Sequence, residues 1–149
     1  MRLRALTPAD LEAVRLLRNQ NREFFFDSRE IDREQQLAWF ARLSSRAVSF
    51  YVIEEDGRVA GTVSVTRQAD GQEIGNLLLA AEYRGRGLMR AAVAQLTASP
   101  GHYYAAVKPG NTASLNVFRA LGFAEEPAGD TIVLGKKVNE TPSRDHSTE

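Results

Sequence analysis

A short basic turn, Arg84-Gly85-Arg86-Gly87, separates an apolar run from a segment with helical spacing. A glycine-containing turn that leads from a strand into a helix presents several backbone N–H groups at the positive end of the helix dipole. Glycine lets the backbone approach a ligand closely, and arginine adds positive charge. The turn is therefore a candidate anion site, although a plain strand-to-helix turn with two solvated arginines fits it equally well. It matches neither a Walker A loop nor the spacing of a dinucleotide-binding loop.

Other chemistry is restricted by composition. Cysteine is absent, and the two histidines, His102 and His146, lie far apart in the chain. These facts exclude a thiolate nucleophile and a cysteine-type zinc site, and they argue against any bound metal. The 19 basic and 19 acidic residues balance, which argues against nucleic acid as a partner. No apolar stretch approaches a membrane-spanning length, so we expect a cytoplasmic protein without a membrane partner.

The elements that must position the turn follow from the hydrophobic periods. Thr7-Pro8-Ala9-Asp10 is typical of a helix start, and Asp32 with Gln35 of a capping box. Leu37, Phe40 and Leu43 are expected to point inward from that second helix. The predicted elements are, in order, strand 3–5, helix 7–19, a helix from 32, strands 48–54, 59–66 and 73–80, helix 86–97, strand 102–107, helix 112–121 and strand 130–138.

Turns at Asp56-Gly57 and Asp70-Gly71 join three of these strands into an antiparallel meander, and a strand–helix–strand crossover follows. This order predicts an α/β fold with a mixed, mostly antiparallel central sheet and about four flanking helices. The length suits a single domain over residues 1–138. Residues 139–149 contain no apolar side chain that could anchor them, so we expect a disordered tail.

Two motifs resemble the GNAT superfamily of acyl-CoA-dependent N-acyltransferases. "EYRGRGLM" is similar to its R/Q-x-x-G-x-G/A signature, with Arg84 and Gly87 at the defining positions. "VKPGNTASLNVFRALGF" is similar to a later motif of the superfamily, with Asn111, Ser114, Phe118, Gly122 and Phe123 at its positions. Both motifs occur in the family's order, and the resemblance extends from about residue 4 to residue 123.

The resemblance implies acetyl-CoA as cosubstrate, with its diphosphate held by the backbone of the turn. It also implies a splayed pair of central strands, one of which bonds the pantetheine arm through its free backbone groups. The coenzyme contacts implied in this way are Leu77, Leu78, Leu79, Arg84, Gly85, Arg86, Gly87, Leu88, Met89, Asn111, Ser114 and Phe118. An asparagine before a helix is just as often an N-cap, so both interpretations of Asn111 stay open.

Two positions depart from the family pattern. Met89 stands where the signature usually ends in glycine or alanine, and its long side chain either points into the core or reshapes the diphosphate site. Phe118 stands where many relatives place a tyrosine that protonates the leaving thiolate. A phenylalanine ring can line a thiol pocket, but it cannot be the acid.

An amine must lose a proton before it attacks a thioester, so transfer needs a base, alignment and polarisation of the carbonyl group. The resemblance points to the backbone N–H of Leu79 as the polarising donor. Glu73 is the candidate base, because some relatives carry a glutamate here and because alternation puts it on one strand face with Leu77 and Leu79. A solvated glutamate is the alternative. The candidate hydroxyl acids are Tyr104 and, as alternatives, Tyr83 and Tyr103.

The connector between the first two helices carries three consecutive phenylalanines, at positions 24–26, in a polar segment. In the family this region forms the acceptor pocket, and its "RN", serine and "WF" resemble a branch that includes N-acetyltransferases of amino-sugar nucleotides. The acceptor contacts implied are Arg18, Asn19, Arg22, Phe25, Ser28 and Trp39. Core packing of the aromatic side chains and solvation of the arginines are the alternative for each residue.

The sequence thus predicts an N-acetyltransferase that moves an acetyl group from acetyl-CoA to a primary amine by direct attack in a ternary complex. The expected acceptor is a small molecule, such as an amino-sugar nucleotide, or a peptide N-terminus. Met89 and Phe118 suggest an alternative, a catalytically inactive acyl-CoA-binding sensor or accessory domain of the same fold. We expect a monomer or a homodimer.

Overall fold

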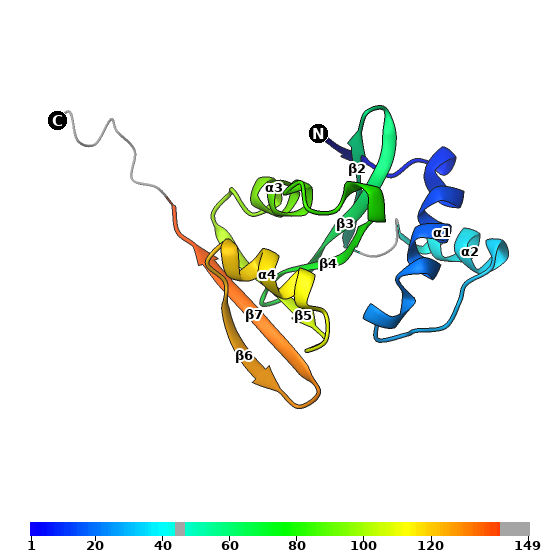
Figure 1. The fold of residues 1–149 in the computed structure, drawn as a ribbon. Coiled ribbons are helices and arrows are strands. Elements are labelled where there is room, and N and C mark those ends of the chain that lie inside the picture. The colour runs from blue at the N-terminus through cyan, green and yellow to red at the C-terminus, as the bar shows by residue number, and fades with distance from the viewer. Residues whose placement is uncertain (44–46, 141–149) are drawn as a thin grey trace, which may run out of the picture.

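A computed structural model describes residues 1–43 and 47–140. Within these residues seven strands form one sheet, in the order β1-β2-β3-β4-β5-β7-β6 (Figure 1). The strands are β1 Arg2–Ala5, β2 Val48–Glu55, β3 Arg58–Gln68, β4 Gly71–Leu79, β5 Gly101–Val107, β6 Ala124–Ala128 and β7 Thr131–Val138. The α-helices are α1 Leu11–Gln20, α2 Arg33–Leu43, α3 Leu88–Leu96 and α4 Thr112–Ala120, and three short 3₁₀ turns are η1 Pro8–Asp10, η2 Arg22–Phe24 and η3 Ala81–Tyr83.

The expected α/β fold with a mostly antiparallel sheet is confirmed. All strand pairs of the described sheet are antiparallel except β4 with β5, which pair in parallel at Gln72 with Tyr103 and at Glu73 with Tyr104. Beyond these two pairs β4 continues to Leu79 without pairing to β5. The central strands therefore splay, as the resemblance implied.

The four helices lie on both sides of the sheet. Figure 1 shows α1 and α2 on one side of β2, β3 and β4, with α3 and α4 on the other. A large apolar core packs around α3 and α4, and it includes Ile74, Val93, Tyr103 and Phe118. Further buried side chains of α1 and β2 lie outside that core and pack beneath the first helices, namely Leu11, Val14, Leu17, Phe50 and Val52.

A β-bulge interrupts β4. Ser64 of β3 pairs with Gly75, whereas Thr62 pairs with Leu78, so β4 carries one extra residue between them. Asn76 lies in this bulge with a φ of 52°, in the left-handed region. Its carbonyl oxygen accepts a hydrogen bond from the Thr62 hydroxyl at 2.8 Å, and its amide nitrogen donates to the Ser64 hydroxyl at 2.8 Å.

The bulge reverses the alternation of side chains along β4. Glu73 pairs with Thr66, so it lies on the α1 and α2 side of the sheet together with Ser64. Leu77 and Leu79 pack against the core on the α3 and α4 side. The prediction that Glu73 shares a strand face with these two leucines is therefore wrong, because a single inserted residue shifts the period.

The inward face of α2 also differs from the prediction. Leu37 is 60% exposed, whereas Gln36 is only 2% exposed and donates to the Leu11 carbonyl oxygen at 3.1 Å. The capping box at the start of α2 is confirmed, since the side chains of Asp32 and Gln35 each accept a hydrogen bond from the other's backbone N–H. Phe40 and Leu43 are partly buried, as predicted, so the inward face of α2 differs from the prediction only in carrying Gln36 in place of Leu37.

β6 was not predicted from the sequence. It contains Pro127 and two glutamates, a composition that argues against a strand. Among the described strands β6 pairs with β7 alone, at the edge of the sheet. An edge strand tolerates proline and charged residues, which explains why the composition misled. The predicted tail lies outside the described residues from position 141 onward.

An ion cluster ties β1 to the first helical turn. The Arg4 guanidinium donates to both carboxylate oxygens of Asp10, at 2.8 and 2.9 Å, and to Glu54 at 2.9 Å. Asp10 is buried and also accepts a hydrogen bond from the Thr7 backbone N–H. The hydrogen bonds from Arg4 hold the pKa of Asp10 at about 2, against the opposing effect of burial.

Candidate active site

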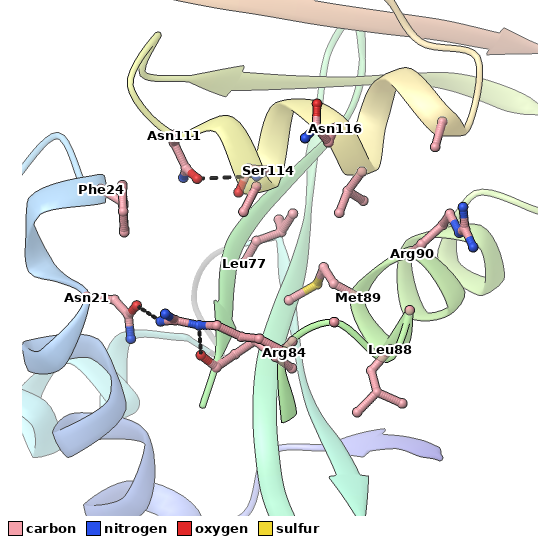
Figure 2. Close-up of a pocket in the computed structure, with 16 residues that line it drawn as sticks. Asn21, Phe24, Leu77, Arg84, Leu88, Met89, Arg90, Asn111, Ser114 and Asn116 are labelled. Carbon is pink, nitrogen blue, oxygen red and sulfur yellow. Dashed lines mark hydrogen bonds between the residues drawn. The ribbon is translucent and has the colours of Figure 1, made fainter. Parts of the chain in front are cut away.

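A cleft of about 400 Å³ lies between the end of β4, the following turn, α3 and α4 (Figure 2). Nine of the twelve predicted coenzyme contacts line it: Leu77, Leu79, Arg84, Gly85, Gly87, Leu88, Met89, Asn111 and Ser114. Leu78 does not, because the bulge turns its side chain to the other side of the sheet. Arg86 and Phe118 also lie outside the lining. The motif residues are thus largely gathered at one place.

The turn has the backbone geometry of an anion site. Gly85 has a φ of 79° and Gly87 a φ of 75°, which L-residues rarely adopt. Gly87 is the N-cap of α3, so the first N–H groups of that helix follow directly. A Cβ atom built at Gly85 would meet nothing within 4 Å. The glycines are therefore needed for the path of the backbone, and open space remains at Gly85.

The two arginines of the turn have partners within the protein. Arg84 donates through Nη2 to Oδ1 of Asn21 at 2.8 Å and through Nε to the Leu79 carbonyl oxygen at 3.4 Å (Figure 2). The Arg86 guanidinium lies 5.2 Å from the centre of the Tyr83 ring. Arg90, which the sequence analysis did not single out, lines the cleft from α3. The backbone of the turn, more than these two side chains, is arranged to receive an anion.

Met89 is directed into the core. Its side chain is 7% exposed and belongs to the core around α3 and α4. Figure 2 shows it extending from α3 toward Leu77 of β4, beneath α4. The longer residue at the end of the signature therefore fills space between strand and helix, and it also lines the cleft.

Asn111 is the N-cap of α4. Its Oδ1 atom accepts a hydrogen bond from the Ser114 backbone N–H at 3.2 Å, and both residues line the cleft. Asn111 can therefore cap α4 and also contact a coenzyme, because capping uses only the carbonyl oxygen of its amide. Phe118 lies about two turns further along α4. It is fully buried, and its ring centre lies 5.0 Å from that of Phe123.

The end of β4 directs backbone groups into the splay. The Ala80 N–H donates to the Ala60 carbonyl oxygen of β3 at 2.8 Å. Because successive residues of an antiparallel strand point their N–H groups to opposite sides, the N–H of Leu79 points away from β3. The contact from Arg84 to the Leu79 carbonyl oxygen, on that same side, agrees with this direction. Leu79 thus presents its backbone to the cleft.

A second, inner cavity of about 230 Å³ lies where β4 and β5 diverge. Glu73 lines it from β4, and Phe118 lines it from α4. The remaining lining is mostly apolar or hydroxyl-bearing: Phe24, Phe25, Phe26, Ser64, Thr66, Ile74, Gly75, Asn76, Leu77, Ala105, Ala106, Val107, Asn111 and Ser114. The inner cavity brings the candidate base beside the splay, although the bulge separates it from the leucine face.

The candidate tyrosines lie outside both cavity linings. The Tyr104 hydroxyl donates to Asp70 at 3.3 Å, and burial, followed by the charges of Asp70 and Glu73, raises its pKa. The Tyr103 hydroxyl donates to the Ser99 carbonyl oxygen at 2.7 Å. Tyr83 packs beneath Arg86. Glu73 lines the inner cavity and Leu79 lines the cleft, whereas these hydroxyl groups are directed elsewhere.

An outer cavity of about 430 Å³ lies between α1, the connector and α2. Arg18, Phe25 and Trp39 line it, whereas Asn19, Arg22 and Ser28 do not. The Arg18 guanidinium holds the connector by donating to the backbone carbonyl oxygens of Asp27 and Arg29 and by stacking on Phe25 at 5.0 Å.

The other predicted acceptor contacts have structural partners or are exposed. The Asn19 amide makes two hydrogen bonds of 3.0 Å with the backbone of Ile31. Arg22 forms an exposed ion pair with Glu30 at 3.5 Å, and Ser28 is exposed. Trp39 packs edge-on against Phe50, with ring centres 5.0 Å apart. An acceptor role for these residues stays a prediction.

Asn21, Phe24, Asn76 and Arg90 are among the cavity residues that were not predicted as contacts from the sequence. Asn76 had a visible signal, because "GN" interrupts an apolar strand and asparagine tolerates left-handed backbone. Asn21 had none, since its partner Arg84 is 63 residues away. In the part of the chain that the structure describes, no group of three or more His, Asp or Glu side chains is arranged to hold a metal ion. No helix of that part is both long and apolar enough to cross a membrane.

Comparison with solved structures supports the same fold. A ribosomal-protein-alanine N-acetyltransferase from Brucella melitensis is 22% identical, with a TM-score of 0.78 over 93% of this chain and 100% of that chain. The putative acetyltransferase yncA from Salmonella typhimurium, solved with its cofactor acetyl-CoA, is 20% identical, with a TM-score of 0.76 over 96% of each chain. A spermidine N-acetyltransferase from Vibrio cholerae, in complex with CoA and spermine, is 19% identical, with a TM-score of 0.74 over 92% of this chain and 96% of that chain.

Sequence comparison identifies the family. A search of curated proteins found no match. A family model described as an acetyltransferase (GNAT) domain matches residues 1–124. That range contains both motifs, the splayed strand pair and the turn. The chain therefore belongs to the GNAT family of acetyltransferases, which are acetyl-CoA-dependent acyltransferases.

Proposed function

We propose that the protein moves an acetyl group from acetyl-CoA to a primary amine by direct attack in a ternary complex. One observation carries the proposal. The coenzyme cleft and the inner cavity share four lining residues, Phe24, Leu77, Asn111 and Ser114, at the splay of β4 and β5. A donor in the cleft and an acceptor in the inner cavity would therefore meet without any rearrangement of the chain.

The cleft suits an acyl-CoA on the residues that are present. Gly85 and Gly87 adopt positive φ values directly before the first N–H groups of α3, and there is open space at Gly85. These N–H groups would hold the diphosphate, and the backbone of Leu77 and Leu79 would bond the pantetheine arm. Acetyl-CoA supplies a thioester, which activates the acetyl carbon toward amines.

Residues of this chain would then deprotonate the amine and polarise the carbonyl. The Glu73 carboxylate accepts a proton from the ammonium form of the acceptor through water. The Leu79 N–H donates to the carbonyl oxygen and stabilises the negative charge that develops there. Attack by the neutral amine forms the C–N bond and breaks the C–S bond. The sulfur departs as thiolate, and the second amine proton, which is lost as the amide forms, passes to that thiolate through water. Phe118 lines the inner cavity without taking part in proton transfer.

The remote part of the acceptor would occupy the outer cavity. The inner and outer cavities share Phe25 and Asn76, so a long acceptor could pass from Glu73 toward Trp39. The outer lining combines aromatic rings with amide and guanidinium groups, which supports an amine with a polar, extended remainder. We propose a small molecule such as an amino-sugar nucleotide, or a peptide N-terminus, as the acceptor.

Two measurements test the proposal. Millimolar coenzyme A should raise the melting temperature, and adenosine, which lacks the diphosphate, should raise it much less. Acetyl-CoA with the correct amine should release free thiol, which can be screened over amino sugars, amino-sugar nucleotides, peptides and polyamines. The absence of any stabilisation by coenzyme A would contradict the proposal.

A second candidate function is acyl-CoA binding without transfer. It is favoured by the absence of a proton donor at Phe118 and by the position of the candidate tyrosines outside the cavity linings. Coenzyme A binding without thiol release over the whole amine panel would support this alternative. Turnover that is lost in Glu73→Gln would exclude it.

A further inference from the structure

Asn21 is a buried residue that hydrogen-bonds both to α1 and to Arg84 at the start of the turn. It is 6% exposed and lies where α1 ends and η2 begins. Its backbone N–H donates to the Arg18 carbonyl oxygen, and its own carbonyl oxygen accepts from Phe24. Its amide nitrogen donates to the Leu17 carbonyl oxygen at 2.8 Å, while its amide oxygen accepts from Arg84. An asparagine at this place uses donor and acceptor together.

The partner of Asn21 belongs to the coenzyme turn. Arg84 carries its backbone into the glycine turn, and its side chain reaches back to Asn21 and to the Leu79 carbonyl oxygen (Figure 2). The hydrogen bond to Asn21 is 2.8 Å long and has a charged donor, which makes it one of the stronger types. Arg84 thus joins the turn, the end of β4 and the end of α1.

The connector that starts at Asn21 forms a wall of three cavities. Phe24 lines the coenzyme cleft, the inner cavity and a third cavity beside Lys108. Lys108, in the loop between β5 and α4, donates to the Glu23 carbonyl oxygen at 3.0 Å and supports the same segment. The position of Phe24 relative to the cleft therefore depends on Asn21 and its neighbours.

We infer that Asn21 is a positioning residue that couples the coenzyme turn to the acceptor connector through Arg84. A ligand on the turn suppresses local opening of the turn, and the hydrogen bond from Arg84 extends that protection to residues 21–32. Coenzyme binding thus stabilises the connector, residues 21–32, before the amine binds. This inference rests on the proposed function in taking the turn as the coenzyme site.

Hydrogen exchange with and without coenzyme A tests the coupling. In the unmodified chain, coenzyme A should slow exchange both in residues 84–91 and, by about tenfold, in residues 21–32. In Asn21→Leu the slowing at 84–91 should remain and the slowing at 21–32 should disappear. Arg84→Met should have the same effect on the connector, while it leaves the bonds of Asn21 to α1 in place.

Asn19→Leu is the matched control. Asn19 also holds the connector with two hydrogen bonds, but it contacts Ile31 and has no bond to Arg84. This variant should loosen the connector and still show protection of residues 21–25 on addition of coenzyme A. Equal loss of protection in Asn19→Leu and Asn21→Leu would overturn the inference, as would protection of the connector that persists in Arg84→Met.

The same experiment separates this inference from the proposed function. Failure of coenzyme A to protect residues 84–91 in the unmodified chain would refute the coenzyme site itself. Protection at the turn without protection at the connector would refute only the coupling. With an acceptor identified, Asn21→Leu should raise the KM for the amine by about tenfold.

Discussion

Glu73 and Leu79 lie on the same strand, β4, but their side chains point to opposite sides of the sheet. The extra residue at Asn76 turns Glu73 toward the α1 and α2 side and leaves Leu79 on the side of the coenzyme cleft. The candidate base and the candidate polarising N–H therefore approach the splay from different sides. A thioester at the splay would have its carbonyl group and the attacking amine handled by separate parts of β4.

Replacement of Glu73 by glutamine tests its role as the base. Glutamine keeps the size of the side chain but cannot accept the proton, so kcat should fall by about 10²–10⁴-fold. The Kd for coenzyme A, measured by calorimetry, should stay unchanged, because Glu73 does not line the coenzyme cleft.

Glu126→Gln is the control for Glu73→Gln. Glu126 is an exposed glutamate of the edge strand β6, and its change removes the same charge from the protein. Its kcat should match that of the unmodified chain. A Glu73→Gln protein with full kcat would assign the base to another group or to water alone.

At the scale of elements, β3 and β4 approach each other unusually closely near the bulge. A Cβ atom on Gly61 would lie 2.1 Å from the Leu78 carbonyl oxygen, a backbone atom that cannot rotate away. The approach holds the end of β4, and with it Leu79, in place against β3. Gly61 is thus required by packing between strands and not by a turn.

Gly61→Ala should lower the free energy of unfolding by about 2–4 kcal/mol, because β4 must shift to admit the methyl group. Urea unfolding measures the change. The shift should also weaken coenzyme A binding, since Leu77 and Leu79 line the cleft.

Gly110→Ala is the matched glycine control. A Cβ atom there would meet nothing within 4 Å, and its backbone is not in the left-handed region. Alanine restricts the unfolded chain, so stability should be unchanged or raised by up to about 1 kcal/mol. A Gly61→Ala protein as stable as Gly110→Ala would show that β3 and β4 separate easily.

At the scale of the whole molecule, the Arg4–Asp10 pair links the first strand to the first helical turn and makes stability depend on pH. The folded pKa of Asp10 is about 2, below the ordinary value of 3.8, chiefly because of the hydrogen bonds from Arg4. Between these values the unfolded chain binds the proton more readily than the folded chain does. The stabilisation is therefore complete above about pH 4 and is lost as the pH falls toward 2.

Asp10→Asn should lower the free energy of unfolding at pH 7 by about 2 kcal/mol, and this deficit should shrink between pH 4 and pH 2. Urea unfolding of both proteins over this range measures it, and the difference removes effects of other carboxylates. Asp130→Asn, in the exposed turn between β6 and β7, should change stability by less than about 0.5 kcal/mol. If the difference in unfolding free energy between the two proteins does not change with pH, the low pKa assigned to Asp10 is contradicted.

Local features were predictable from the sequence, whereas contacts between distant segments were not. The cap at Asp32 and Gln35 and the glycine turn are set by neighbouring residues, and both have the expected form. Asn76 lies in a bulge because of its pairing with β3, which no local pattern encodes. Asn21 meets Arg84 only once α1 and β4 lie side by side. Arg18 and Asn19 bind connector carbonyls for the same reason, although the family pattern suggested substrate contacts.

Two residue pairs between β4 and β5 join the β1–β4 part of the described sheet to the β5–β7 part. Each of these two parts contains several paired strands, and few backbone hydrogen bonds connect one part to the other. Met89 of α3 and Phe118 of α4 belong to the buried core against which Leu77 and Leu79 of β4 pack. A smaller residue at position 89 would remove volume from this core, so the packing around Leu77, which lines both the cleft and the inner cavity, depends on the long side chain at the end of the signature.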